Sequence, residues 1–319
     1  MGLALLSLFL LSLHAPSARL AGARGGRALQ MGTTTADVLA LAQSAGREAA
    51  VMVRQRLGAE VLSTKASRGD LLTEVDGAVQ ELIERSVADT FPTHGFLGEE
   101  SVAAGAKASK EALEAAMDAA DTEWLWICDP IDGTTNFVQS LPLVGISIGV
   151  ARRATDGGWK MECGVIIDPL RGGEIEVFSA TAGGGAFLNG SPIRVGAEAL
   201  SDAVVATGFA PNEASLRPMV RGIAAVGARA RTVRMLGSAA IMLAWVACGR
   251  LSAYFEADLN AWDTAAGVLI VREAGGIVTD LCGQPFQIAT RPIIASGPET
   301  YSELQAVLAE AGVVGLDAV

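Results

Sequence analysis

Apolar side chains recur at helical spacing along several stretches of the chain. Residues 33–57 carry them every three or four positions, and the threonines at the start of this stretch are possible caps. Residues 70–91 repeat the pattern up to Pro92, which cannot continue a helix. The same spacing predicts further helices at residues 215–226, 238–248 and 264–274, and Gly275–Gly276 then stands where a helix end favours glycine.

Short apolar runs between these stretches are typical of buried strands. The clearest are WLWIC at residues 124–128 and VGISIGV at residues 144–150. Strands are also predicted on either side of the turn residues 169–172 and at residues 185–190, 204–209 and 252–256. Because helices flank the strands on both sides, the sequence predicts an α/β fold, an α+β layered sandwich of alternating helix and sheet layers. We expect one domain over residues 33–319, with two halves that meet near residue 192.

The first 32 residues differ in composition from the rest of the chain. No acidic residue precedes Asp37, and the apolar run from Leu3 to Leu13 is too short to span a bilayer. This run resembles the core of a signal peptide, and the arginine-rich segment after it resembles an organelle transit peptide. A disordered leader, or a true start at Met31, is the alternative. We expect a soluble mature protein directed to an organelle (plastid or mitochondrion) or to secretion, and otherwise a cytoplasmic one.

Composition narrows the possible chemistry. Half of the residues are hydrophobic and 18% are charged, which excludes wholesale disorder. The net charge of −11 argues against a nucleic-acid partner or an anionic membrane, since both require clustered positive charge. Two histidines and four well-separated cysteines exclude a multi-histidine zinc site and a disulfide framework. Carboxylates and backbone groups remain to carry the chemistry.

The segment DPIDGTTNF, Asp129–Phe137, is the strongest functional motif. It follows a predicted strand, and its turn can direct the carboxylates of Asp129 and Asp132 and the carbonyl of Ile131 toward one point. Oxygen ligands of this kind select a hard cation such as Mg²⁺. The following Gly133 and its neighbours resemble a helix start, whose free N–H groups suit a phosphate. An ordinary Asp-Pro turn with a capping aspartate is the structural alternative.

Three other acidic segments have weaker signals when each is taken alone. Glu99 and Glu100 follow an apolar pair and would ordinarily be solvated at a strand end. Asp263 directly precedes a predicted helix and would be a good N-cap. The segment DLLTEVD, which ends at Asp76, suits an ordinary helix entry.

Together, FLGEESVAAG, DPIDGTTNF and WDTAAG followed by REAGG resemble the inositol monophosphatase family of Mg²⁺-dependent, lithium-sensitive phosphatases. The resemblance runs in order from about Ala36 to Ser296 and is greatest to the inositol-1-monophosphatase branch of a superfamily that includes fructose-1,6-bisphosphatases. It implies the layered fold of that superfamily, a small phosphorylated polyol as substrate, and a homodimer. It also implies a place in inositol metabolism and phosphatidylinositol signalling.

Position by position, the resemblance implies an active site with two or three Mg²⁺ ions. The implied metal ligands are Glu99, Asp129, the carbonyl of Ile131, Asp132 and Asp263. Thr134 and Asp76 would join Glu99 in activating the attacking water, and Lys65 would lie near the third, weaker metal position. The implied substrate-binding residues are Asp132, Gly133, Thr134, Gly237, Ser238, Ala239, Glu256 and Asp263.

This machinery suits the hydrolysis of a phosphate monoester, which is extremely slow without a catalyst. We expect in-line attack of metal-activated water on myo-inositol monophosphate, giving myo-inositol and phosphate. The same site would serve histidinol phosphate, a sugar 1-phosphate such as L-galactose 1-phosphate, or a nucleotide 3′-phosphate, because it grips the phosphate and not the leaving group. A non-catalytic metal-binding regulator is the less favoured alternative.

Overall fold

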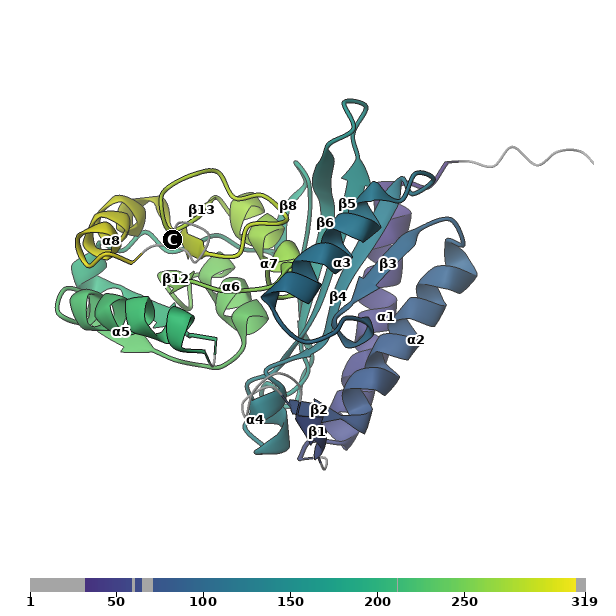
Figure 1. Cartoon of the computed structure of the whole chain (residues 1–319), viewed down its shortest axis with the longest axis horizontal. Helices are drawn as coiled ribbons and strands as arrows, with labels where there is room; N and C mark the ends of the chain where they lie inside the picture. The colour runs from purple at the N-terminus through teal and green to yellow at the C-terminus, as the bar shows by residue number, and fades with distance from the viewer. Residues whose placement is uncertain (1–31, 59–60, 65–70, 211, 314–319) are drawn as a thin grey trace, which may run out of the picture. The chain divides into compact units, whose positions relative to one another are not determined.

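The computed structural model describes residues 32–58, 61–64, 71–210 and 212–313 (Figure 1). The chain divides into Met1–Thr33 and one compact unit, Thr34–Val319, and the fold below is that of the second unit. The predicted presequence lies almost wholly outside the described residues, as does Lys65, so both stay predictions. Within the described residues, no helix combines the length and the apolar character needed to cross a membrane.

Seven described strands form one sheet in the first half of this unit. They are β3 (Gly95–Gly98), β4 (Trp124–Asp132), β5 (Gly145–Arg153), β6 (Trp159–Asp168), β7 (Glu176–Thr181), β8 (Gly185–Leu188) and β9 (Ser191–Pro192). The strand order follows the chain order; β3 and β4 are parallel, and all later neighbours are antiparallel. The central strands are buried on both faces, which explains the apolar runs in their sequences.

Helices α1 (Thr35–Gln55) and α2 (Glu74–Thr90) cover one face of this sheet (Figure 1). Each begins with a capping box, in which a threonine hydroxyl and an aspartate carboxylate accept each other's backbone N–H groups. The pairs are Thr34 with Asp37, and Thr73 with Asp76. Their apolar faces pack with residues of β4, β5 and β6 in one buried cluster. The caps and the apolar spacing together explain where both helices form.

Helices α6 (Ala239–Ala247) and α7 (Ala261–Glu273) cover the opposite face of the sheet. Both are buried along nearly their whole length, so they show no polar face. The backbone of α7 approaches β6 so closely that a Cβ on Gly164 would lie 2.6 Å from the carbonyl oxygen of Ala266. Only glycine allows this approach, which fixes the position of α7 on the sheet.

A second sheet contains five of the described strands. They are β10 (Val204–Thr207), β11 (Thr232–Arg234), β12 (Ala253–Glu256), β13 (Ile277–Thr279) and β14 (Ile293–Ser296). Their order is β11-β10-β12-β14-β13, with β10 parallel to both of its neighbours and the other pairs antiparallel. Successive residues of β12 face opposite clusters: Tyr254 packs with α6 and α7, and Phe255 packs with α5 (Glu213–Gly227) and α8 (Pro298–Glu310).

Five layers therefore follow one another within the compact unit (Figure 1). They are α1 with α2, the seven-stranded sheet, α6 with α7, the five-stranded sheet, and α5 with α8. This arrangement confirms the prediction of a sandwich in which helix and sheet layers alternate.

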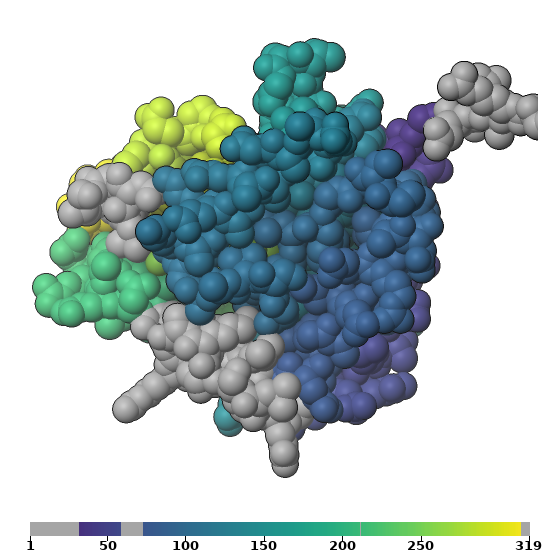
Figure 2. Space-filling view, turned by 45° about the vertical axis from the view of Figure 1, so that its right-hand side comes forward, coloured from purple at the N-terminus to yellow at the C-terminus, as the bar shows by residue number. Residues whose placement is uncertain are grey.

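Several elements differ from the sequence expectations. Residues 71–73 form strand β2 (Leu71–Thr73), which pairs with β1 (Val61–Thr64), so α2 begins at Glu74 and not at residue 70. Helix α3 (Ala106–Asp118), helix α8 and strands β13 and β14 were not expected. Figure 2 shows α3 in blue beside the yellow segment that follows β13, and the two line a groove of about 470 Å³.

Candidate active site

Two aspartates lie at the C-terminal end of β4. In a regular strand, residues three apart point to opposite faces. Here the pairing of β4 with β5 shifts register between Asp129 and Asp132, so an irregular turn replaces the regular alternation. The N–H of Ile131 donates to Oδ1 of Asp129 at 3.0 Å and closes this turn. The turn directs both carboxylates toward the start of α7.

Helix α7 brings a third aspartate to the same place. Oδ2 of Asp263 accepts the N–H of Asn260, the N-cap of the helix, at 2.6 Å. The hydroxyl of Ser147 on β5 donates to the carbonyl oxygen of Trp262 at 2.8 Å and ties this turn to the sheet. The expectation that the helix starts at Thr264, with Asp263 as its cap, is wrong. The helix starts at Ala261, and Asp263 is its third residue.

One carboxylate oxygen from each of Asp129, Asp132 and Asp263 lies within 4.8 Å of the other two. Asp129 is only 2% exposed. Burial, followed by the negative charges of Glu99, Asp132 and Asp263, raises the pKa of Asp129 well above its usual value. Burial and the charges of Asp132 and Glu99 raise the pKa of Asp263 in the same way. Three carboxylates this close repel one another unless protons or cations compensate their charge.

The first turn of α6 holds Asp132 in place. The Ser238 hydroxyl donates to Oδ2 of Asp132 at 2.6 Å, and the N–H of Ala240 donates to the same atom at 2.5 Å. Ser238 is also the N-cap of α6 and accepts the N–H of Ile241 at 3.3 Å. Burial raises the pKa of Asp132 to about 6, although these hydrogen bonds lower it. Asp132 thus joins the end of β4 to the start of α6.

Glu99 opens the short 3₁₀ turn Glu99–Ser101, directly after β3. It is not one of the three clustered carboxylates, but its charge raises the pKa values of all three, so it lies near them. The side chain of Gln80 on α2 holds the turn: it accepts the N–H of Glu100 and donates to the Ser101 hydroxyl, both at 2.8 Å. Sequence reasoning missed Gln80, although it is a polar residue one helical turn after Asp76 on the buried face of α2.

Gly133 turns the chain from β4 into the short helix α4 (Thr134–Val138). Its φ is +97°, and a Cβ there would lie 3.0 Å from the carbonyl oxygens of Leu143 and Gly237. A residue with a side chain would therefore be both strained and crowded at this position. The same contacts bring Gly237, at the start of the α6 turn, against the aspartate turn.

Thr134 links this turn to α2. Its hydroxyl lies 3.3 Å from Oδ1 of Asp76 and 3.1 Å from the carbonyl oxygen of Ile131. A hydroxyl has one hydrogen, so it donates to only one of these acceptors at a time. The other oxygen of Asp76 accepts the N–H of Thr73 at 2.8 Å and also the Thr73 hydroxyl. Asp76 is 1% exposed.

Glu256 and the segment Gly237–Ala239 both lie near Asp132, since Ser238 donates to Asp132 and the charge of Asp132 raises the pKa of Glu256. Glu256 ends β12, is buried, and accepts the hydroxyl of Tyr254 at 2.6 Å. Burial and the charges of Asp132 and Asp258 raise the pKa of Glu256 to about 8, although the Tyr254 hydrogen bond lowers it. Glu256 therefore binds its proton more tightly than an ordinary glutamate, with Tyr254 as a fixed partner.

The donor set fits a hard divalent cation. All the groups that converge are oxygens, without histidine or cysteine, which is the chemistry that Mg²⁺, Ca²⁺ and Mn²⁺ prefer. The pKa values of Asp129, Asp132 and Asp263 are raised first by burial and then by neighbouring carboxylates, and a bound cation would stabilise their charged forms. These three residues are the ones that could hold a metal, with Glu99 and the carbonyl of Ile131 close by.

Comparison with known proteins decides the family. The model of the inositol monophosphatase family matches residues 34–313. This chain belongs to the inositol monophosphatase family. It is 37% identical over 247 residues to inositol monophosphatase 2 of Homo sapiens, which covers 76% of this chain and 80% of that protein. It is 41% identical over 231 residues to inositol monophosphatase 2 of Solanum lycopersicum, covering 71% and 81%.

A solved structure shares the fold of this inositol monophosphatase family member. Extragenic suppressor protein suhB from Bartonella henselae superposes with a TM-score of 0.74 at 31% identity, covering 85% of this chain and 98% of that one. Residues 34–313, which the family model matches, include every element from α1 to α8. The resemblance inferred from the three acidic motifs is therefore confirmed, and so is the phosphatase class of the family.

The site also depends on a residue to which the sequence motifs assigned no role. Asn136, within DPIDGTTNF, is buried, and its side-chain amide donates to the carbonyl oxygens of Leu143 and Leu236, both at 2.7 Å. These bonds join the aspartate turn to the segment before Gly237. A buried asparagine within a short helix is a signal for such a link, since buried amides are normally hydrogen-bonded.

Proposed function

We propose that this chain hydrolyses inositol monophosphate to inositol and inorganic phosphate, with Mg²⁺ as its cofactor. One observation carries the proposal: the carboxylates of Asp129, Asp132 and Asp263 converge within 4.8 Å in a chain of the inositol monophosphatase family. Relatives named inositol monophosphatase cover most of the chain and support the same substrate. Phosphate monoesters need strong stabilisation of developing negative charge, and an acidic cluster that recruits cations supplies it.

In this proposal, five groups hold two or three metal ions. When bound, Mg²⁺ would neutralise charge on the phosphate and make a bound water more acidic. Asp129, the most buried of the three clustered aspartates, would be the central metal-holding residue. The complete ligand set would be Glu99, Asp129, the carbonyl of Ile131, Asp132 and Asp263.

Thr134 and Asp76 would orient the attacking water. If the carbonyl of Ile131 faces a metal, the Thr134 hydroxyl gives its single hydrogen to Oδ1 of Asp76. A lone pair of Thr134 Oγ1 is then free to accept a hydrogen from water. The second oxygen of Asp76 is held by Thr73, so Asp76 cannot turn away. Glu99 would accept the other hydrogen of this water.

The remaining residues would bind the substrate. The N–H groups of Gly133 and Thr134, which start α4, would donate to the phosphate. Gly237, Ser238 and Ala239 would line the inositol ring, and Glu256 would bond its hydroxyls. Because Tyr254 already donates to Oε2 of Glu256 and holds this carboxyl group in place, the hydroxyls of the polyol would hydrogen-bond to the other oxygen, Oε1. Asp132 and Asp263 would contact the substrate through the bound metal.

The test is phosphate release from a panel of monoesters by the purified chain. The panel contains myo-inositol 1-phosphate, histidinol phosphate, a sugar 1-phosphate and a nucleotide 3′-phosphate, each with Mg²⁺ and with excess EDTA. We expect the highest kcat/KM for myo-inositol 1-phosphate, loss of activity in EDTA, and inhibition by Li⁺. A preference for another monoester would overturn the substrate, and release of phosphate from none of them would overturn the activity.

Glu256→Gln separates substrate choice from the phosphate machinery. It should raise KM most for myo-inositol 1-phosphate, because a site that bonds hydroxyls discriminates through them. Asp263→Asn should instead lower the turnover of every substrate alike. If Glu256→Gln lowers all activities equally, Glu256 does not select the polyol.

Three further proposals concern the protein as a whole. We propose that residues 33–319 act as one phosphatase domain, that residues 1–32 are a targeting presequence, and that the protein is a homodimer. N-terminal sequencing of the protein from its native cells tests for cleavage near residue 32. Light scattering on the purified protein distinguishes a dimer from a monomer.

A further inference from the structure

A loop of four residues, 257–260, separates two ends of the proposed site. It starts after Glu256, the last residue of β12, and ends at Asn260, the N-cap of α7. The N–H of Asn260 donates to Asp263 at 2.6 Å, and the carbonyl oxygen of Asn260 accepts the hydroxyl of Thr264 at 3.2 Å. This loop is therefore the short covalent link between Glu256 and the helix turn that carries Asp263.

The side chain of Arg291, just before β14, binds two residues of this loop. Its Nε and Nη2 lie 2.7 Å and 2.6 Å from Oδ1 of Asp258, and its Nη1 donates to Oδ1 of Asn260 at 2.9 Å. The backbone adds a third link, because the N–H of Leu259 donates to the carbonyl oxygen of Arg291 at 3.2 Å. Asn212, the N-cap of α5, donates to the other oxygen of Asp258 at 3.3 Å.

The ion pair of Arg291 with Asp258 is largely buried, so breaking it is costly. The side chains of Arg291 and Asp258 are 16% and 6% exposed. A carboxylate this buried requires a charged partner, and removing the partner leaves an uncompensated charge. The planar guanidinium presents its N–H groups in a fixed fork that reaches both Asp258 and Asn260, whereas a lysine ammonium has no such fork.

We propose that Arg291 is a positioning residue of this site, which holds the 257–260 loop so that Glu256 and Asp263 keep the separation that substrate and metal binding require. The inference rests on the roles proposed above for Glu256 and Asp263. Among the described residues, the side chain of Arg291 makes its polar contacts with Asp258 and Asn260 and forms no hydrogen bond or ion pair with Glu256 or Asp263, so it acts through the loop. Small displacements of binding groups lower rates strongly. Losing the contacts of Arg291 with the loop should therefore lower kcat/KM more than the loss of Tm alone would explain.

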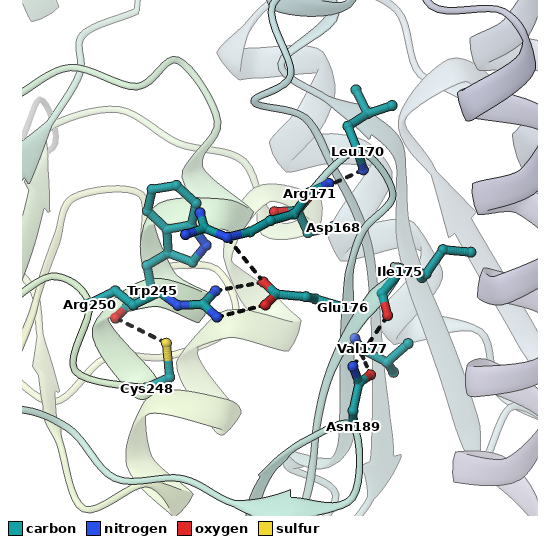
Figure 3. Close-up of polar contacts among 10 residues, drawn as sticks. All are labelled: Asp168, Leu170, Arg171, Ile175, Glu176, Val177, Asn189, Trp245, Cys248 and Arg250. Atoms are coloured by element: carbon teal, nitrogen blue, oxygen red, sulfur yellow. Dashed lines mark hydrogen bonds and ion pairs between the residues drawn. The ribbon is translucent and has the colours of Figure 1, made fainter. Parts of the chain in front are cut away.

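The chain offers a matched control in the pair of Arg250 with Glu176 (Figure 3). Nη1 and Nη2 of Arg250 donate to the two carboxylate oxygens of Glu176, both at 2.6 Å. The side chains are 29% and 16% exposed, so this pair is also largely buried. It ties the end of α6 to the start of β7, and none of its partners is a proposed site residue (Figure 3).

The experiment compares Arg291→Lys with Arg250→Lys in the full chain. For each variant, kcat and KM are measured on myo-inositol 1-phosphate, Mg²⁺ affinity by titration calorimetry, and Tm by scanning calorimetry. Arg291→Lys should lower kcat/KM about tenfold or more and weaken Mg²⁺ binding about threefold or more, as expected for displaced binding groups. Arg250→Lys should stay within about twofold of wild type in both, at a similar loss of Tm.

A double variant separates positioning from stability. Arg291→Met leaves the Asp258 carboxylate buried without its cation, so its Tm should fall clearly. Adding Asp258→Asn removes that charge and should restore most of the Tm, while kcat/KM and Mg²⁺ affinity stay low because Asn260 is still not held. If the double variant recovers kcat/KM together with Tm, or if the two lysine variants lose kcat/KM equally, Arg291 has a structural role only.

The metal titration also keeps this inference distinct from the proposed function. If the wild-type chain releases no phosphate from myo-inositol 1-phosphate, the proposed substrate is wrong. The positioning of Asp263 is then decided by Mg²⁺ affinity alone. Weaker binding in Arg291→Lys than in Arg250→Lys supports it, and equal binding overturns it.

Discussion

Replacing Ser238 with alanine should make metal binding more sensitive to acid. The Ser238 hydroxyl donates to Asp132 at 2.6 Å and lowers its pKa, although burial still raises this pKa to about 6. A hydrogen bond to a charged group contributes roughly 1.5 to 3 kcal/mol. The lower value applies to Ser238, because the N–H of Ala240 still donates to Asp132 when the hydroxyl is removed. One pKa unit corresponds to about 1.36 kcal/mol. Ser238→Ala should therefore raise the pKa of Asp132 by about one unit.

This shift has a distinct pH signature. Below the pKa, each unit of increase lowers the ionised fraction about tenfold, so Mg²⁺ should bind about tenfold more weakly at about pH 5. At about pH 8.5 the carboxylate is ionised in both proteins, and the affinities should agree to within about twofold. The assay is titration calorimetry with Mg²⁺ across this pH range. A loss of affinity that is equal at both pH values would refute the reasoning.

A control is needed because Ser238 also caps α6. Loss of an N-cap costs about 1 kcal/mol, which corresponds to a Tm decrease of about 2 °C in a domain of this size. Thr34→Ala removes a comparable cap from α1, far along the chain from the acidic cluster, and should lower Tm without changing the pH dependence of Mg²⁺ binding. Ser238→Thr keeps the hydroxyl and should behave like wild type.

Three further predictions concern charge, backbone and water. Because the folded-state pKa of Asp132 is raised to about 6, metal-free protein should lose stability as the pH rises from about 4 through about 6. Calorimetry should then show that Mg²⁺ raises Tm by an amount that grows over this pH range. A Tm gain that shrinks with rising pH would contradict this prediction. Gly133→Ala should lower Tm and reduce kcat more than about tenfold, because its Cβ would crowd two carbonyl oxygens. The control is Gly157→Ala: Gly157 also has a positive φ, but a Cβ there would meet no atom within 4 Å, so this variant should keep full activity. Thr134→Val should lower kcat about 100-fold in phosphate-release assays while Mg²⁺ affinity stays near wild type, since it removes only the hydroxyl that faces Asp76.

The layered fold was predictable because its central elements bury most of their residues. The apolar runs of β4 and β5 and the capped, periodic sequence of α1 are signals that neighbouring elements reinforce. Helix α3 gives a weaker signal: among its residues only Ser109 and Leu113 are buried, so it lacks a continuous apolar face. Helix α8 does carry a periodic set in Leu304, Val307 and Leu308, and closer reading of that spacing would have found it.

The candidate site was predictable where its residues are close in sequence. Asp129 and Asp132 share one turn, so their spacing alone indicates convergence. The approach of Asp263 depends on the packing of α7 against the sheet, which local sequence does not contain; only the family resemblance brought it into the site. Gln80 and Arg291 support the site from elsewhere in the chain. Such partners are set by tertiary contacts, and no local pattern identifies them.

The central claim is that a buried carboxylate at Asp129 recruits the metal on which phosphate release depends. Asp129→Asn tests it against Asp168→Asn, because Asp168 is equally buried at 2% exposure, also accepts backbone N–H groups, and has a pKa raised by burial (Figure 3). Phosphate release from myo-inositol 1-phosphate and Mg²⁺ binding are measured for both variants. We expect Asp129→Asn to abolish turnover and weaken Mg²⁺ binding, while Asp168→Asn retains both. Turnover by Asp129→Asn equal to that of Asp168→Asn would contradict the account.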